Sequence, residues 1–102
     1  MKLLVVITIE EYADELRKIF KENKVPSYSE TDVTNFRLFE EAYETENWFG
    51  NNETSMEGKL FFTFMNDKTS ARLVKSIEEF SKDCQCNNPI RVFQLAVEKY
   101  FI

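Results

Sequence analysis

Two short segments of this chain are apolar on both of the faces that a β-strand presents. They are residues 3–9, which read LLVVITI, and residues 60–65, which read LFFTFM. A strand with one wet face alternates apolar and polar residues, whereas a continuous apolar run is typical of a strand covered on both sides. We therefore expect a sheet in which both faces are buried.

Two helices are expected to connect the strands. The first begins near Thr8 and Glu11, which resemble a capping box, and ends near Asn23. Its apolar residues recur at helical spacing and are Ile9, Tyr12, Ala13, Leu16, Ile19 and Phe20. The second helix is capped by Asn66 or Asp67 and has as its apolar positions Ala71, Val74, Ile77, Phe80 and Cys84.

Two further strands complete the pattern, at residues 27–39 and at residues 90–102. The order is βαββαβ, which predicts an α+β, ferredoxin-like sandwich: an antiparallel four-stranded sheet with two helices on one face. The 102 residues are enough for one domain, residues 1–102. Because the helices cover one face only, the apolar strands predict that the other face is an interface in an oligomer that closes around a symmetry axis.

A long acidic segment, residues 38–58, separates the second strand from the third. It contains six glutamates and no Lys or Arg, so within a net charge of −5 the rest of the chain carries +1. Loops of this length are usually functional. Aromatic residues among glutamates suit the binding of a partner protein, and the expected contacts are Glu40, Glu41, Tyr43, Glu44, Glu46, Trp48 and Phe49. The alternative is a solvated loop whose Trp packs back on its own sheet.

Composition excludes several function classes. A pI near 4.8 argues against binding of duplex nucleic acid, which requires a basic surface. The chain has no histidine, so no ordinary catalytic triad is available and we expect no enzymatic reaction. The N-terminal apolar run turns acidic without a cleavage site, which predicts a buried strand rather than a signal peptide or membrane span. We expect a cytoplasmic protein.

The two cysteines, Cys84 and Cys86, are too close in sequence to join distant parts of the fold, which suits a reducing compartment. Their thiolates are suited to Cu(I) or Zn(II), provided that other side chains or other subunits complete the site. The alternative places Cys84 in the core of the second helix and Cys86 in a turn. The guanidinium groups of Arg37 and Arg91 are suited to binding an anionic effector. The alternative is that they form surface ion pairs with the many glutamates.

Residues 31–37, TDVTNFR, resemble the T-E-V-x-G-F-G stretch that enters the T-loop of PII nitrogen-regulatory proteins, and residues 90–93, IRVF, resemble I-F-V-F in their last strand. The resemblance implies a homotrimer that binds small effectors in clefts between subunits. Residues 38–58 would form the T-loop, which docks on a partner such as a membrane transporter. The implied effector-binding residues are Thr31, Phe36, Arg37, Asn87, Asn88 and Arg91.

The turn before the last strand departs from the PII pattern. PII proteins have a glycine-rich turn ending in Lys that cradles phosphates, whereas residues 84–89 here read CQCNNP. We therefore expect weak or absent ATP binding in the PII manner, and the sequence names no cofactor. A segment from Trp48 to Lys59 also resembles the W-W-E-G-K turn of CutA-type cation-tolerance proteins, which implies a metal-binding trimer as the alternative. A third possibility is a ferredoxin-like interaction domain that binds no effector.

Overall fold

The computed structural model describes residues 1–38, 55–84 and 90–102. The elements follow the predicted order of strands and helices. They are β1 (Lys2–Ile9), the short 3-10 helix η1 (Glu10–Tyr12), α1 (Ala13–Glu22), β2 (Ser29–Phe36), β3 (Ser55–Met65), α2 (Asp67–Asp83) and β4 (Arg91–Ala96).

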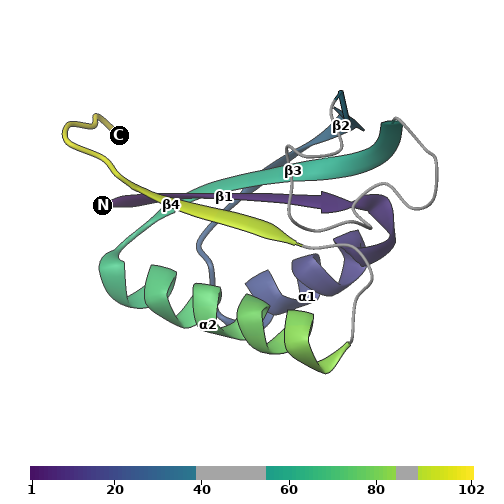
Figure 1. The fold of residues 1–102 in the computed structure, drawn as a ribbon. Helices are drawn as coiled ribbons and strands as arrows, with labels where there is room; N and C mark the ends of the chain where they lie inside the picture. The colour runs from purple at the N-terminus through teal and green to yellow at the C-terminus, as the bar shows by residue number, and fades with distance from the viewer. Residues whose placement is uncertain (39–54, 85–89) are drawn as a thin grey trace.

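The strands form one sheet in the order β2-β3-β1-β4, and every neighbouring pair is antiparallel. Figure 1 shows α1 and α2 side by side on the same face of this sheet. The α+β, ferredoxin-like arrangement is therefore confirmed. No helix among the described residues is long and apolar enough to cross a lipid bilayer.

The core lies between the helices and the sheet. Three residues of β1 (Leu4, Val6 and Thr8) and three of β3 (Phe61, Thr63 and Met65) are buried on the face toward the helices. The ring of Phe20 on α1 packs edge-on against Phe61 of β3, with centroids 5.3 Å apart. Burying each such side chain stabilises the fold by about 1.5–3 kcal/mol. The buried cluster is Leu4, Val6, Ala13, Leu16, Ile19, Phe20, Phe61, Met65, Leu73 and Ile77.

The two predicted helix starts have different outcomes. Asn66 caps α2 as predicted, because its side chain accepts a hydrogen bond of 2.9 Å from the backbone N–H of Thr69. The capping box at Thr8 is wrong, since β1 continues to Ile9 and no side chain caps η1 or α1. Thr8 instead points into the protein, where it is fully buried and its hydroxyl has no hydrogen-bond partner.

Replacing Thr8 with valine is expected to stabilise the protein. Valine has nearly the same shape, and it removes a buried hydroxyl whose desolvation no hydrogen bond repays. We expect the free energy of unfolding to rise by about 1 kcal/mol, measured by urea denaturation at a fixed protein concentration. A loss of stability instead would show that the hydroxyl has a bound partner, such as an internal water.

The buried face of α2 is shifted from the predicted one. Leu73 and Ile77 are buried, Val74 and Phe80 pack at the margin of the core, and Ala71 is exposed. The helix ends before Cys84, which is an exposed C-cap residue rather than a core residue.

Strand ends also differ from those predicted. β3 begins at Ser55 rather than after Gly58, because residues 55–58 pair with β2. β4 ends at Ala96, which pairs with Lys2 at the start of β1. Beyond this pair the backbone N–H of Val97 reaches the carbonyl of Met1, at 3.2 Å, and β1 offers no further partner. Residues 98–102 therefore lie outside the sheet.

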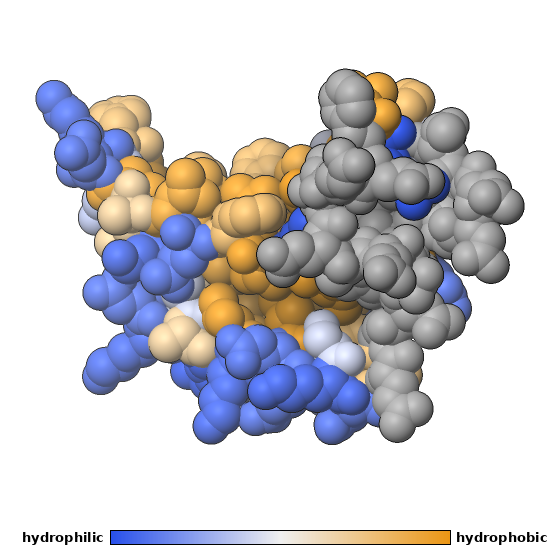
Figure 2. Space-filling model, viewed as in Figure 1, coloured by the Kyte–Doolittle hydropathy of each residue, from blue (hydrophilic) through white to orange (hydrophobic). Residues whose placement is uncertain are grey.

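The sheet face without helices is apolar, as predicted. Cross-strand pairing places its central side chains in three rows, which are Leu95–Leu3–Phe64, Phe93–Val5–Phe62 and Arg91–Ile7–Leu60. Phe64, Phe93 and Leu95 are each about half exposed. Figure 2 shows hydrophobic surface on the β4 side of the molecule, above the hydrophilic surface of the helices. One arginine is the sole charge in these three rows.

Candidate functional site

The predicted effector-binding residues that the structure describes lie on the two edge strands. Thr31 on β2 pairs with Leu60, Leu60 with Ile7, and Ile7 with Arg91 on β4. These four residues thus form one row across the sheet, with Thr31 and Arg91 at its ends. Three strand spacings separate the ends by about 14 Å. One chain therefore does not bring Thr31 and Arg91 together.

Phe36 and Arg37 lie farther along the same edge as Thr31. Phe36 is the last residue of β2 and its side chain is 64% exposed, and the half-buried Arg37 follows it. Both residues therefore lie next to the start of the acidic segment. Asn87 and Asn88, the remaining predicted effector contacts, fall outside the described residues.

An ion pair that the sequence did not predict joins β2 to β3 beside this edge. The Lys59 ammonium donates a hydrogen bond to the Asp32 carboxylate on the paired strand. This hydrogen bond, together with the negative charges of Asp32, Glu10 and Glu30, raises the pKa of Lys59 above its usual value. Two residues farther along β2, the Thr34 hydroxyl donates a hydrogen bond of 3.1 Å to the Glu57 carboxylate on β3. The end of the β2–β3 pair nearest the acidic segment is thus held by polar cross-strand contacts.

A second ion pair anchors the other half of β2 to α1. The Arg17 guanidinium binds the Glu30 carboxylate through two nitrogens, both at 3.0 Å, and also contacts Asp14. The hydrogen bond with Glu30 is the main reason that the pKa of Arg17 is raised. This ion pair therefore joins the edge strand to the helix layer next to Thr31.

The remaining predicted sites are described only in part. The partner-binding residues between Glu40 and Phe49 lie outside the described residues, as does Cys86. Cys84 is disulfide-bonded, so it offers no thiolate to a metal ion in this state. Among the described residues, no group of three or more His, Cys, Asp or Glu side chains is placed to hold a metal ion.

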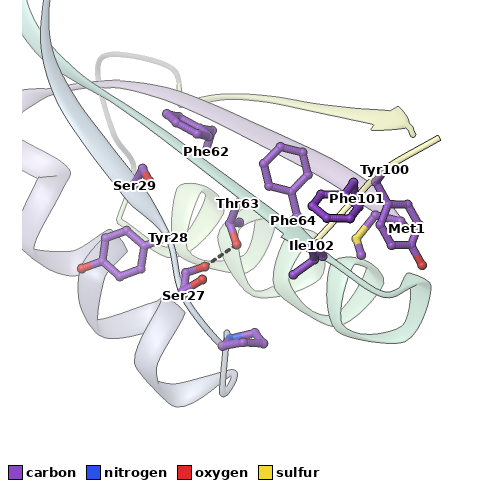
Figure 3. A pocket seen from close by; sticks show the side chains of 11 residues that line it. Met1, Ser27, Tyr28, Ser29, Phe62, Thr63, Phe64, Tyr100, Phe101 and Ile102 are labelled. Carbon is purple, nitrogen blue, oxygen red and sulfur yellow. Dashed lines mark hydrogen bonds between the residues drawn. The ribbon is translucent and has the colours of Figure 1, made fainter. Parts of the chain in front are cut away.

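Sequence reasoning missed a pocket at the opposite end of the sheet. It has a volume of about 400 Å³ and lies between the sheet and residues 100–102. Figure 3 shows Phe62 and Phe64 on the sheet side of the pocket, with Phe101 and Ile102 beside Phe64. The signal in the sequence was the polar pair at residues 98–99, which interrupts the apolar pattern of the last predicted strand.

Comparison with known proteins identifies the fold. Neither a family model nor a curated protein matches the sequence. A solved structure of a DUF3240 family protein from Shewanella baltica OS155 is 17% identical, with a TM-score of 0.69, over 99% of this chain and 93% of that one.

A second similar structure is CPII, a nitrogen regulatory PII-like protein from Thiomonas intermedia K12. It is 11% identical, with a TM-score of 0.64, over 98% of this chain and 94% of that one. The CPII structure holds ADP, AMP and bicarbonate. At these identities the comparison concerns the fold, and the resemblance to PII-like proteins is confirmed at that level.

Proposed function

We propose that this chain, which has the PII-like fold, is a regulatory protein rather than an enzyme. In the proposal it forms a homotrimer and binds a small anionic effector in a cleft between the β2 edge of one subunit and the β4 edge of the next. The acidic segment then reports the bound state to a partner protein.

The observation that carries the proposal is the placement of Thr31 and Arg91 at the two ends of one row of the sheet. A ring of subunits that brings β2 of one copy beside β4 of the next also brings these residues together. Arg37 lies farther along the β2 edge, so the cleft would offer two guanidinium groups from different chains. Guanidinium forks bind carboxylate and phosphate groups well.

Two further features support assembly through these edges. β2 and β4 each pair on one side only among the described strands, and an exposed strand edge is usually covered or paired. The adjoining helix-free face is apolar and nearly uncharged, so leaving it in water is unfavourable. A closed ring covers both the edges and the face.

The link to a partner rests on position and charge. Phe36 and Arg37 lie at the end of β2, where the chain enters the acidic segment, so an effector held there would contact the base of this segment. Because its six glutamates favour a basic surface, we propose that the partner is a membrane transporter with positively charged cytoplasmic loops. Charge would speed the encounter, and Trp48 would anchor the complex.

Cross-linking tests the proposed cleft without knowledge of the effector. Thr31→Cys and Arg91→Cys are combined in one chain that also carries Cys84→Ser and Cys86→Ser, and a short bis-maleimide is added. Within one chain the two positions are about 14 Å apart, too far for a short linker. We expect covalent dimers and trimers on a denaturing gel and no larger species.

The matched controls are the two single-cysteine chains, which are expected to stay uncross-linked. An absence of cross-links in a protein that is nevertheless trimeric would contradict the edge-to-edge cleft. A ladder extending beyond the trimer would indicate an open chain of subunits instead of a ring.

Titration calorimetry with ADP, AMP, bicarbonate and ATP then tests effector binding. Heat of binding that Arg37→Ala and Arg91→Ala each remove would support the cleft, whereas heat that neither variant changes would place the ligand elsewhere. We expect ATP to bind weakly at most, because residues 84–89 lack the glycines and lysine of the PII phosphate cradle.

A further inference from the structure

We propose that residues 100–102, which we call the hook, clasp a second copy of this chain. In this arrangement the pocket between the hook and its own sheet receives an apolar side chain from that copy. The inference rests on the assembly in the proposed function, and it assigns a role to a segment which that proposal does not use.

The hook is apolar and is not buried by its own chain. The side chains of Tyr100, Phe101 and Ile102 are 61%, 99% and 93% exposed. Figure 1 shows that the chain rises from the end of β4, away from the helices, and bends back above the start of β1. Two large apolar side chains in water at one exposed bend are unfavourable, and burial in an interface removes this cost.

The area of the exposed apolar side chains also favours a role in assembly. The four most exposed ones on the sheet face, Phe62, Phe64, Phe93 and Leu95, offer roughly 350 Å² if each large side chain has about 200 Å² in all. One partner in a standard interface contributes about 800 Å². On the same scale the hook adds roughly 500 Å². Face and hook together reach the area that one stable interface needs.

The chemistry of the pocket indicates what occupies it. Its lining contains no Asp, Glu, Lys or Arg side chain, and the hydroxyl of Thr63 is already bonded to the Ser27 carbonyl at 2.6 Å. An apolar occupant therefore matches Phe62, Phe64, Phe101 and Ile102 better than a charged one does. The pocket is also continuous with the apolar sheet face, because Phe62 and Phe64 belong to both. A second copy that covers the face would meet the hook and the pocket at the same time.

Sedimentation equilibrium of Phe101→Ser tests the proposal. Phe101 is almost fully exposed in the single chain, so this substitution leaves the core intact. Loss of a buried Phe side chain is expected to weaken subunit association about tenfold or more. A chain that stops after Lys99 should weaken it further. Lys75→Ser is the control, because Lys75 is exposed on α2 on the side opposite the buried Leu73 and Ile77, and its association should be unchanged.

Placing the photoreactive residue p-benzoylphenylalanine at position 101 tests the contact directly. We expect cross-links between chains, at residues of the sheet face or the pocket. Cross-links confined to one chain, or equal association of Phe101→Ser and the unaltered protein, would overturn the hook while leaving the trimer in place. Stoichiometric binding of an apolar dye to the unaltered trimer, with association unaffected by Phe101→Ser, would overturn it in favour of a small-molecule site.

A monomer at every concentration would contradict both the assembly in the proposed function and the hook. If the unaltered chain forms a trimer, the assembly is supported. The association of Phe101→Ser then tests the hook alone. Circular dichroism of each variant shows that it is folded before its association is measured.

Discussion

Replacing Phe93 with aspartate is expected to convert the proposed trimer into a folded monomer. Phe93 lies in the middle row of the helix-free face, beside Val5, and is 49% exposed in the single chain. The core on the other face of the sheet therefore does not depend on it. In the assembly, however, the new carboxylate would be buried against apolar side chains without a partner.

A buried charge without a partner costs about 3–5 kcal/mol, so association should weaken more than about a hundredfold. Light scattering and sedimentation at micromolar concentration measure this loss as a change in molar mass toward 12.1 kDa, the mass of one chain. Lys75→Asp is the control, since it places a carboxylate on an exposed residue of α2, on the helix side of the sheet and away from the face. If Phe93→Asp remained a trimer with unchanged affinity, the helix-free face would not be the interface.

The sequence predicted the order of the elements but misplaced their ends, because a strand ends where its partner ends. Residues 55–58 look like part of a polar loop, yet they belong to β3 since β2 lies alongside them. Residues 97–102 look like a strand, yet they leave the sheet since β1 begins at Lys2. Composition within a segment does not report where the neighbouring strand stops.

The capping box at Thr8 shows the same limit for a local motif. Its spacing to Glu11 fits a helix start, but the apolar pattern of β1 continues through Ile9 and directs Thr8 into the core. The motif at Asn66 succeeded because the preceding strand ends at Met65, which leaves Asn66 extended and able to cap α2. A cap forms only where tertiary structure lets the strand end.

The candidate site could be predicted as a set of residues but not as a geometry. The resemblance to PII-like proteins named Thr31 and Arg91, and neither periodicity nor composition shows that they share one row of the sheet. That fact depends on the register of three strand pairs. The pocket beneath the hook was missed for a related reason, since residues 100–102 were assigned to a strand rather than to a bend above it.

Replacing Gly58 with alanine is expected to destabilise the fold strongly. Gly58 lies inside β3, between Ile9 of β1 and Val33 of β2. A Cβ atom added there would be 2.2 Å from the carbonyl oxygen of Thr8 and 2.7 Å from the side-chain nitrogen of Asn35. The Thr8 carbonyl is backbone in the adjoining strand, so it moves only if β1 and β3 separate locally.

Inserting a methyl group into so tight a contact should lower the free energy of unfolding by about 3 kcal/mol, a large part of the roughly 5–15 kcal/mol typical of a folded domain. Urea denaturation of Gly58→Ala measures this loss. The double variant with Asn35→Ala separates its causes, because it relieves the contact with the side chain and leaves the contact with the Thr8 carbonyl. We expect Gly58→Ala to lower the free energy of unfolding almost as much in the Asn35→Ala background as in the unaltered protein. If Gly58→Ala cost no stability in that background, the Asn35 side chain, not the β1 backbone, would be what requires glycine at this position.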